Sequence, residues 1–133
     1  MKNFPMTSMV LVANLMIGCS TAVANCLSYG QSISITGYYG SIVLPGTPNY
    51  TSINDGDEVE NIPFLFLETP VCTGEDPAGF GESVPSIAMI QLACPSELIS
   101  LFEESTGTPL TVTGSLFASH TGHHHTAILL SCE

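Results

Sequence analysis

Basic residues are nearly absent from this chain. Its 133 residues include one Lys or Arg, Lys2, against 12 Asp and Glu, and the formal net charge is −11 with neutral histidines. Such a surface repels nucleic-acid phosphates and anionic lipid headgroups, which excludes nucleic acid as a partner. The charge instead favours cations, basic proteins or solubility alone.

Several catalytic and binding signatures are also missing. The chain has no Trp and 8% aromatic residues, a composition that argues against a platform for stacking sugars. It has no C-x-x-C pair for a zinc ribbon or a thioredoxin-like redox site. A G-x-S-x-G nucleophile elbow is absent as well. We therefore expect a binding protein and not an enzyme.

Long apolar runs are lacking too. The longest apolar stretch near the start, residues 6–17, is too short to span a bilayer. Lys2 precedes it and the small residues Ala22-Val23-Ala24 follow it, which together are typical of a cleaved secretory signal. We predict a signal peptide over residues 1–24 and one domain over residues 25–133. Loss of Lys2 leaves a net charge of −12.

A second processing route stays open at Cys19. The run Met16-Ile17-Gly18-Cys19 resembles a lipobox, in which Cys19 would carry a lipid anchor. Either route predicts a domain outside the cytoplasm. The expected location is the periplasm or the medium, with a lipid-anchored envelope protein as the alternative.

Four cysteines belong to the predicted domain: Cys26, Cys72, Cys94 and Cys132. In an exported domain of this size, four cysteines indicate two disulfides, with three pairings to choose from. Because disulfides would use all four thiols, no cysteine nucleophile remains.

The domain alternates short apolar runs with turn-forming residues, which is typical of a mostly β fold. The predicted strands span residues 32–44, 63–72, 85–94, 110–118 and 126–132, with a long acidic loop over residues 45–61. Leu98, Ile99, Leu101 and Phe102 recur at helical spacing after Ser96, which we expect to cap this helix. A helix between strands three and four of five is the layout of a small OB-like barrel.

This topology also predicts the disulfides. The first two strands of such a barrel form a hairpin, which brings Cys26 close to Cys72. Strands three and five run in parallel, and each ends at a cysteine, Cys94 or Cys132. We therefore predict the pairs Cys26–Cys72 and Cys94–Cys132.

Four histidines within six residues are the most unusual local feature. They are His120, His123, His124 and His125. Neutral imidazole is a good ligand for zinc, copper or nickel. On an extended backbone His123 and His125 project to one side and His124 to the other.

In the predicted barrel this loop borders the same face as residues 45–61. That loop offers Asn49, Tyr50, Asp55, Asp57 and Glu60 as further ligand-loop residues. Histidines and carboxylates would thus converge on a transition-metal site. Other interpretations stay open. The histidines only fix the hairpin by hydrogen bonds, and the acidic loop is solvated surface or holds calcium loosely without the spacing of an EF-hand loop.

The chain also resembles a bacterial exported family catalogued as domain of unknown function 4431. The matching residues are Val112–Ala118, Thr121-Gly-His-His-His-Thr126, Ile128–Leu130, Cys26–Tyr29, Pro45–Tyr50, Gly56-Asp57, Glu60, Pro70–Cys72 and Gln91-Leu92. The resemblance implies a secreted or periplasmic β domain with no assigned activity. Two departures from the pattern are Thr108-Pro109-Leu110, where the family tends to have a basic residue, and the additional Cys94 and Cys132.

Two functional hypotheses follow. The first is an extracytoplasmic binding module with a His-lined site for a divalent transition metal. The second is an acidic envelope protein that binds a basic partner such as a lysozyme-like enzyme. A purely structural domain is the third alternative.

Overall fold

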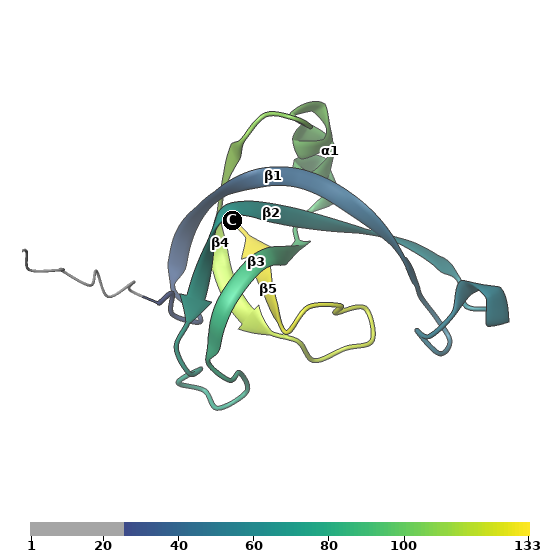
Figure 1. Cartoon of the computed structure of the whole chain (residues 1–133), viewed down its shortest axis with the longest axis horizontal. Coiled ribbons are helices and arrows are strands. Elements are labelled where there is room, and N and C mark those ends of the chain that lie inside the picture. The colour runs from purple at the N-terminus through teal and green to yellow at the C-terminus, as the bar shows by residue number, and fades with distance from the viewer. Residues whose placement is uncertain (1–25) are drawn as a thin grey trace, which may run out of the picture.

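The computed structural model describes residues 26–133, so the predicted signal peptide and Cys19 lie outside the described residues. The domain is a closed five-stranded β-barrel with one helix between the third and fourth strands, as predicted (Figure 1). Its strands are β1 (Ser32–Pro45), β2 (Val59–Thr73), β3 (Val84–Ala93), β4 (Leu110–Ala118) and β5 (Ile128–Cys132). A 3-10 turn, η1 (Ile53–Asp55), interrupts the β1–β2 connection, and α1 spans Ser96–Glu104.

The strand order around the barrel is β1-β2-β3-β5-β4. All neighbours are antiparallel except β3 and β5, which pair in parallel over three residue pairs ending at Ala93 and Ser131. The barrel closes because β1 pairs with two strands: its first half pairs with β4 and its second half with β2. The change of partner falls at Gly37, where a Cβ atom would collide with the Phe66 carbonyl.

The barrel interior is filled by alternate residues of all five strands. Eleven buried side chains form this core: Tyr29, Ile35, Tyr39, Leu65, Ile87, Ile90, Leu92, Val112, Leu116, Ile128 and Leu130. Ile99 and Phe102 of α1 pack against the same cluster, so the helix covers one end of the barrel. Burial of this apolar surface is the main driving force for folding.

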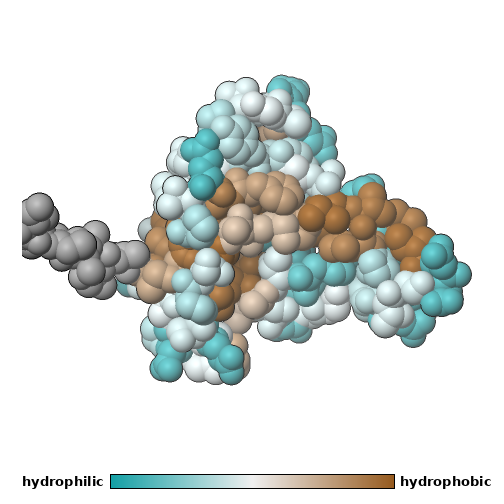
Figure 2. Space-filling model, viewed as in Figure 1, coloured by the Kyte–Doolittle hydropathy of each residue, from teal (hydrophilic) through white to brown (hydrophobic). Residues whose placement is uncertain are grey.

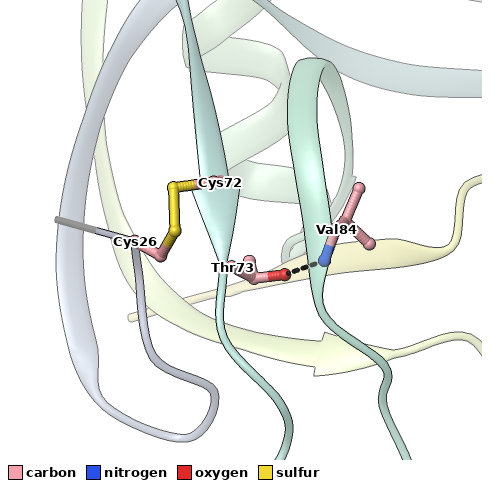
Figure 3. Close-up of a disulfide and its surroundings, with 4 residues drawn as sticks. All are labelled: Cys26, Cys72, Thr73 and Val84. Atoms are coloured by element: carbon pink, nitrogen blue, oxygen red, sulfur yellow. Dashed lines mark hydrogen bonds between the residues drawn. A yellow bond between two sulfur atoms is a disulfide. The ribbon is translucent and has the colours of Figure 1, made fainter. Parts of the chain in front are cut away.

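Both predicted disulfides are confirmed. Cys26 is bonded to Cys72 with a Cα–Cα distance of 4.6 Å, and Cys94 to Cys132 with 4.8 Å. Figure 3 shows the first beside β2, where Thr73 accepts a hydrogen bond from the Val84 amide at 3.1 Å. Disulfides persist in oxidising compartments, so this pair of bonds fits a domain outside the cytoplasm. No helix within residues 26–133 has the length and apolarity needed to cross a membrane.

Two local predictions were wrong. Ser96 does not cap α1: Pro95 occupies the N-cap position and no side chain binds the free amides there. The second strand begins at Val59 and not at Pro63, so the loop after β1 is shorter than predicted. Pairing with β1 accounts for the extension, because Pro45 and Val59 still lie opposite each other in the ladder.

The extended part of this ladder projects from the barrel as a two-stranded arm (Figure 1). Residues 59–63 of β2 pair with β1 alone, because the β2–β3 pairing begins at Phe64. The space-filling view shows an apolar surface along this arm (Figure 2), where Val43 and Val59 are exposed. The arm carries the β1–β2 loop beyond the barrel wall.

Candidate functional site

The loop between β4 and β5, residues 119–127, contains all four histidines and is called the His loop below. It extends from the barrel in the same direction as the β1–β2 arm (Figure 1). A backbone hydrogen bond from the Ser119 amide to the Ala127 carbonyl, at 3.0 Å, closes its base. A second one, from His124 to Thr121 at 3.1 Å, forms the turn at its tip.

A row of outward-facing residues crosses three strands beside the His loop. Phe64 of β2, Gln91 of β3 and Leu129 of β5 are direct neighbours across the three strands and are all buried. Their strand neighbours Leu65 and Leu130 point into the barrel interior, so this row must face outward. An outward row is buried only when something covers it.

Gln91 connects this row to the His loop. Its amide nitrogen donates to the His123 carbonyl at 2.8 Å, and its amide oxygen accepts from the His125 N–H at 2.6 Å. Both polar ends of the buried side chain are therefore satisfied. The two bonds hold the His loop backbone on both sides of His124. They therefore fix the backbone conformation of His123, His124 and His125.

The β1–β2 loop, residues 46–58, is organised by Asp57. This buried carboxylate accepts hydrogen bonds from the amides of Asn49 at 2.9 Å, Thr51 at 2.7 Å and Ser52 at 2.9 Å. The Ser52 and Thr51 bonds are the main causes that lower the Asp57 pKa from 3.8 to about 2, and the Asn49 bond adds to them. Asp57 therefore acts as the internal anchor of the loop.

This anchor predicts a defined acid sensitivity. Because the folded-state pKa of Asp57 is lowered, its contribution to stability is complete above the unfolded pKa and is lost as the pH falls from about 4 to about 2. Urea unfolding across this pH range is expected to show a higher free energy of unfolding for wild type than for Asp57→Asn. This difference is expected to shrink as the pH falls. Asp55→Asn, an exposed change in the same loop, is the matched control and is expected to show no such difference.

Tyr50 links the two loops. Its backbone has a positive φ of 57°, and its ring lies so close to Gly122 that a Cβ atom there would be 2.6 Å from the ring. The hydroxyl of Tyr50 is 3.0 Å from Nε2 of His123, and the two rings meet edge to face with centroids 5.1 Å apart. The absence of a side chain at Gly122 is what permits this contact.

Glu60 of β2 joins two of the histidines. One carboxylate oxygen lies 2.6 Å from Nδ1 of His123, and the other lies 3.5 Å from Nε2 of His125. Glu60 and His125 are largely buried, whereas 57% of the His123 side chain is exposed. A Cβ atom on Gly46 would lie 2.6 Å from the Glu60 side chain, so Gly46 leaves the room that this carboxylate occupies.

The other two histidines form a separate pair. Nδ1 of His124 accepts a hydrogen bond from the His120 amide at 3.0 Å, and Nδ1 of His120 contacts the Ala118 carbonyl at 3.1 Å. Both rings pack against Phe117, with centroid distances of 5.8 Å for His120 and 5.5 Å for His124. Partial burial lowers the pKa of His124, and the other three histidines lower it further.

The structure thus divides the predicted site residues into three groups. His123, His125, Glu60 and Tyr50 meet, and we call these four the Glu60 cluster. His120 and His124 face Phe117 instead. Asn49 and Asp57 hold the acidic loop together internally, and Asp55 is exposed in η1.

Gln91 is a site residue that the sequence did not predict. Its only local signal is an amide between the apolar residues Ile90 and Leu92 in a predicted strand. That pattern indicates an outward side chain, but the loop that binds it lies more than 30 residues away.

The cluster is not preassembled around a metal. Within residues 26–133, no three His, Cys, Asp or Glu side chains form a group ready to hold a metal ion. His123 and Glu60 are in direct hydrogen-bond contact, whereas ligands of one ion are separated by that ion.

The fold places this chain among closed five-stranded OB-like barrels with one helix between the third and fourth strands. Residues 89–133 match the family model of a domain of unknown function (DUF4431), which confirms the predicted resemblance for this segment. The segment runs from within β3 to the C-terminus and includes the whole His loop. No curated protein and no solved structure matches the chain.

Proposed function

We propose that this protein is an extracytoplasmic binding module that takes one divalent transition metal ion at the Glu60 cluster, with His123, His125 and Glu60 as ligands. The observation that carries the proposal is the position of one carboxylate against ring nitrogens of two histidines. Two imidazoles and a carboxylate are a donor set used for zinc, copper and nickel. Without other ligands, the remaining coordination position would belong to water or an external molecule.

The distances support a site that closes around the ion on binding. Donor atoms around tetrahedral zinc lie about 3.3 Å apart, given zinc–nitrogen bonds of about 2.0–2.1 Å. The 3.5 Å between Glu60 and His125 is close to that spacing. The 2.6 Å between Glu60 and His123 is a hydrogen bond, which zinc would replace. His123 is the more exposed of the two histidines, so its side chain has the room to move when the ion binds.

The surroundings of His123 support the same proposal. A metal-bound histidine usually has its second ring nitrogen held by another group, which fixes the orientation of the ring. The Tyr50 hydroxyl lies at that second nitrogen, Nε2, and leaves Nδ1 directed at Glu60. Gln91 fixes the backbone on both sides of His124, so His123 and His125 are presented together.

Zinc titration of the oxidised full chain, purified without a polyhistidine tag, tests this function. Calorimetry is expected to show one ion per protein. Replacement of His123, His125 or Glu60 is expected to weaken binding by at least about tenfold, since even the loss of a group that only orients a ligand typically costs about 10- to 100-fold. Glu60→Gln is the sharpest variant, because glutamine preserves the size of the side chain and keeps one acceptor oxygen, but it is uncharged and a poor ligand.

His120→Ala is the matched control, since it removes an imidazole from the same loop but outside the Glu60 cluster. It is expected to leave zinc affinity unchanged. Equal losses in His120→Ala and His123→Ala would indicate diffuse binding by any histidine of the loop. Absence of zinc, copper and nickel binding by wild type would reject the metal function, and the cluster would then be a hydrogen-bonded latch between two loops.

A second candidate function rests on charge. Residues 26–133 contain all 12 acidic residues and neither Lys nor Arg, so the imidazoles are the only basic side chains in the domain. We propose that this surface attracts a basic protein in the envelope or the medium, because a strongly negative field steers cationic partners. Such binding weakens as salt screens the field.

A further inference from the structure

A pocket outside the Glu60 cluster lies between the β2–β3 loop, residues 74–83, and the end of β4. It is open to solvent and has a volume of about 450 Å³. Its lining residues are Asp76, Phe80, Phe117, Ala118, Ser119 and His120. Two phenylalanine rings and one carboxylate therefore border the same space.

Phe80 is the most exposed large apolar side chain of the described domain, with 84% of its surface accessible. The loop that carries it is anchored on both sides. Before it, the Asp76 amide donates to the Gly81 carbonyl at 2.9 Å. After it, the Tyr29 hydroxyl donates to the Glu82 carbonyl at 2.9 Å, and Gly81 packs on the Tyr29 ring. A hydrogen-bonded loop thus holds an apolar ring in water beside a second ring, Phe117, and a partner that covers both rings would gain from burying this apolar surface.

Apart from His120, the titratable groups around the pocket are acidic. One Asp76 oxygen accepts a hydrogen bond from the Ala78 amide at 3.0 Å, which orients the carboxylate. Glu75 and Glu82 line an adjoining depression that shares Asp76 with this pocket. The described residues 26–133 supply neither Lys nor Arg to neutralise these carboxylates.

We propose that this pocket receives a lysine or arginine side chain of a basic partner protein. The inference rests on the second candidate function and specifies where its contact is made. The methylene stem of a basic side chain packs well on apolar walls. Its charged head is attracted by the faces of aromatic rings and by a carboxylate. Phe80, Phe117 and Asp76 provide these three features in one pocket.

A hexa-arginine peptide is a suitable probe, and hexa-citrulline is its neutral counterpart. We expect the oxidised full chain to bind hexa-arginine at low ionic strength and to show no binding of hexa-citrulline. Amide shifts in an NMR titration are expected to centre on Asp76, Phe80 and Phe117. Phe80→Ala and Asp76→Asn are each expected to weaken binding by about two- to fivefold, as for an exposed cation–π contact or ion pair.

Two further variants make the outcome decisive. Phe80→Tyr keeps an aromatic face and is expected to bind as wild type does. Glu97→Gln removes one carboxylate at the start of α1, away from the pocket, and is expected to change affinity by less than about twofold. Glu97→Gln could weaken hexa-arginine binding as much as Asp76→Asn does, while Phe80→Ala leaves the affinity unchanged. In that case binding is driven by overall charge and the pocket assignment is wrong. If wild type does not bind hexa-arginine, both the pocket and the second candidate function fail.

Discussion

Replacing Phe64 with alanine is expected to lower the free energy of unfolding by about 3–5 kcal/mol, the range for a fully buried phenylalanine. Phe64 is 1% exposed, although it lies on the outer face of the barrel. Its removal would leave a cavity beside Gln91, which the His loop contacts. Because Gln91 holds the backbone of His123 and His125, we also expect this variant to bind zinc more weakly. Chemical unfolding and zinc calorimetry measure the two effects.

Phe66→Ala is the matched control for this prediction. Phe66 is two residues further along the same face of β2 but is 38% exposed, and its ring lies over Gly40. We expect this change to cost less than half as much stability and to leave zinc binding intact. Equal costs for the two variants would contradict the view that the burial of Phe64 on the outer face stabilises the domain.

Removal of the Cys94–Cys132 disulfide by a double alanine substitution is expected to cost about 2–4 kcal/mol. The bond links residues separated by 38 positions, so its loss increases the conformational freedom of the unfolded chain. It also joins the ends of β3 and β5, whose parallel pairing comprises three residue pairs. Denaturant unfolding under oxidising conditions measures the change.

The Cys26–Cys72 double alanine variant separates the general stability cost of losing a disulfide from a local effect on the β3–β5 pairing. Its loop is of similar length, with a separation of 46, so a comparable loss of stability is expected. Amide exchange at Leu92 and Leu130 is expected to rise further in the Cys94–Cys132 variant, because only that bond closes the β3–β5 seam. Identical exchange at these amides in both variants would show that hydrogen bonds alone hold the seam.

Local patterns predicted most of the fold. Alternation of apolar residues gave the bounds of β4, and helical spacing placed α1 after Pro95. The strand and helix order then limited the topology to one barrel, from which both disulfides followed. These predictions succeeded because strand alternation and helix periodicity depend on neighbouring residues.

Features that depend on distant contacts were predicted less well. The early start of β2 at Val59 arises from pairing with Pro45, and the acidic residues nearby gave a loop signal instead. The sequence predicted that His123 and His125 share one side of the loop and that His124 lies on the other, but it did not predict which groups each side contacts. The structure shows these partners, since Glu60 contacts His123 and His125 while Phe117 packs against His120 and His124.

The sequence by itself determined the closed barrel, the disulfide pairing and the strongly acidic surface, because strand periodicity, cysteine positions and net charge are properties of the chain. Only the tertiary structure decided which side chains meet. Glu60 and His123 are 63 positions apart in the sequence. The register of β1 against β2 places Glu60, and the hydrogen bond from Gln91 to the His123 carbonyl places His123, so that the two meet. Such contacts arise from the packing of loops on the outside of the barrel, for which the sequence carries no periodic signal.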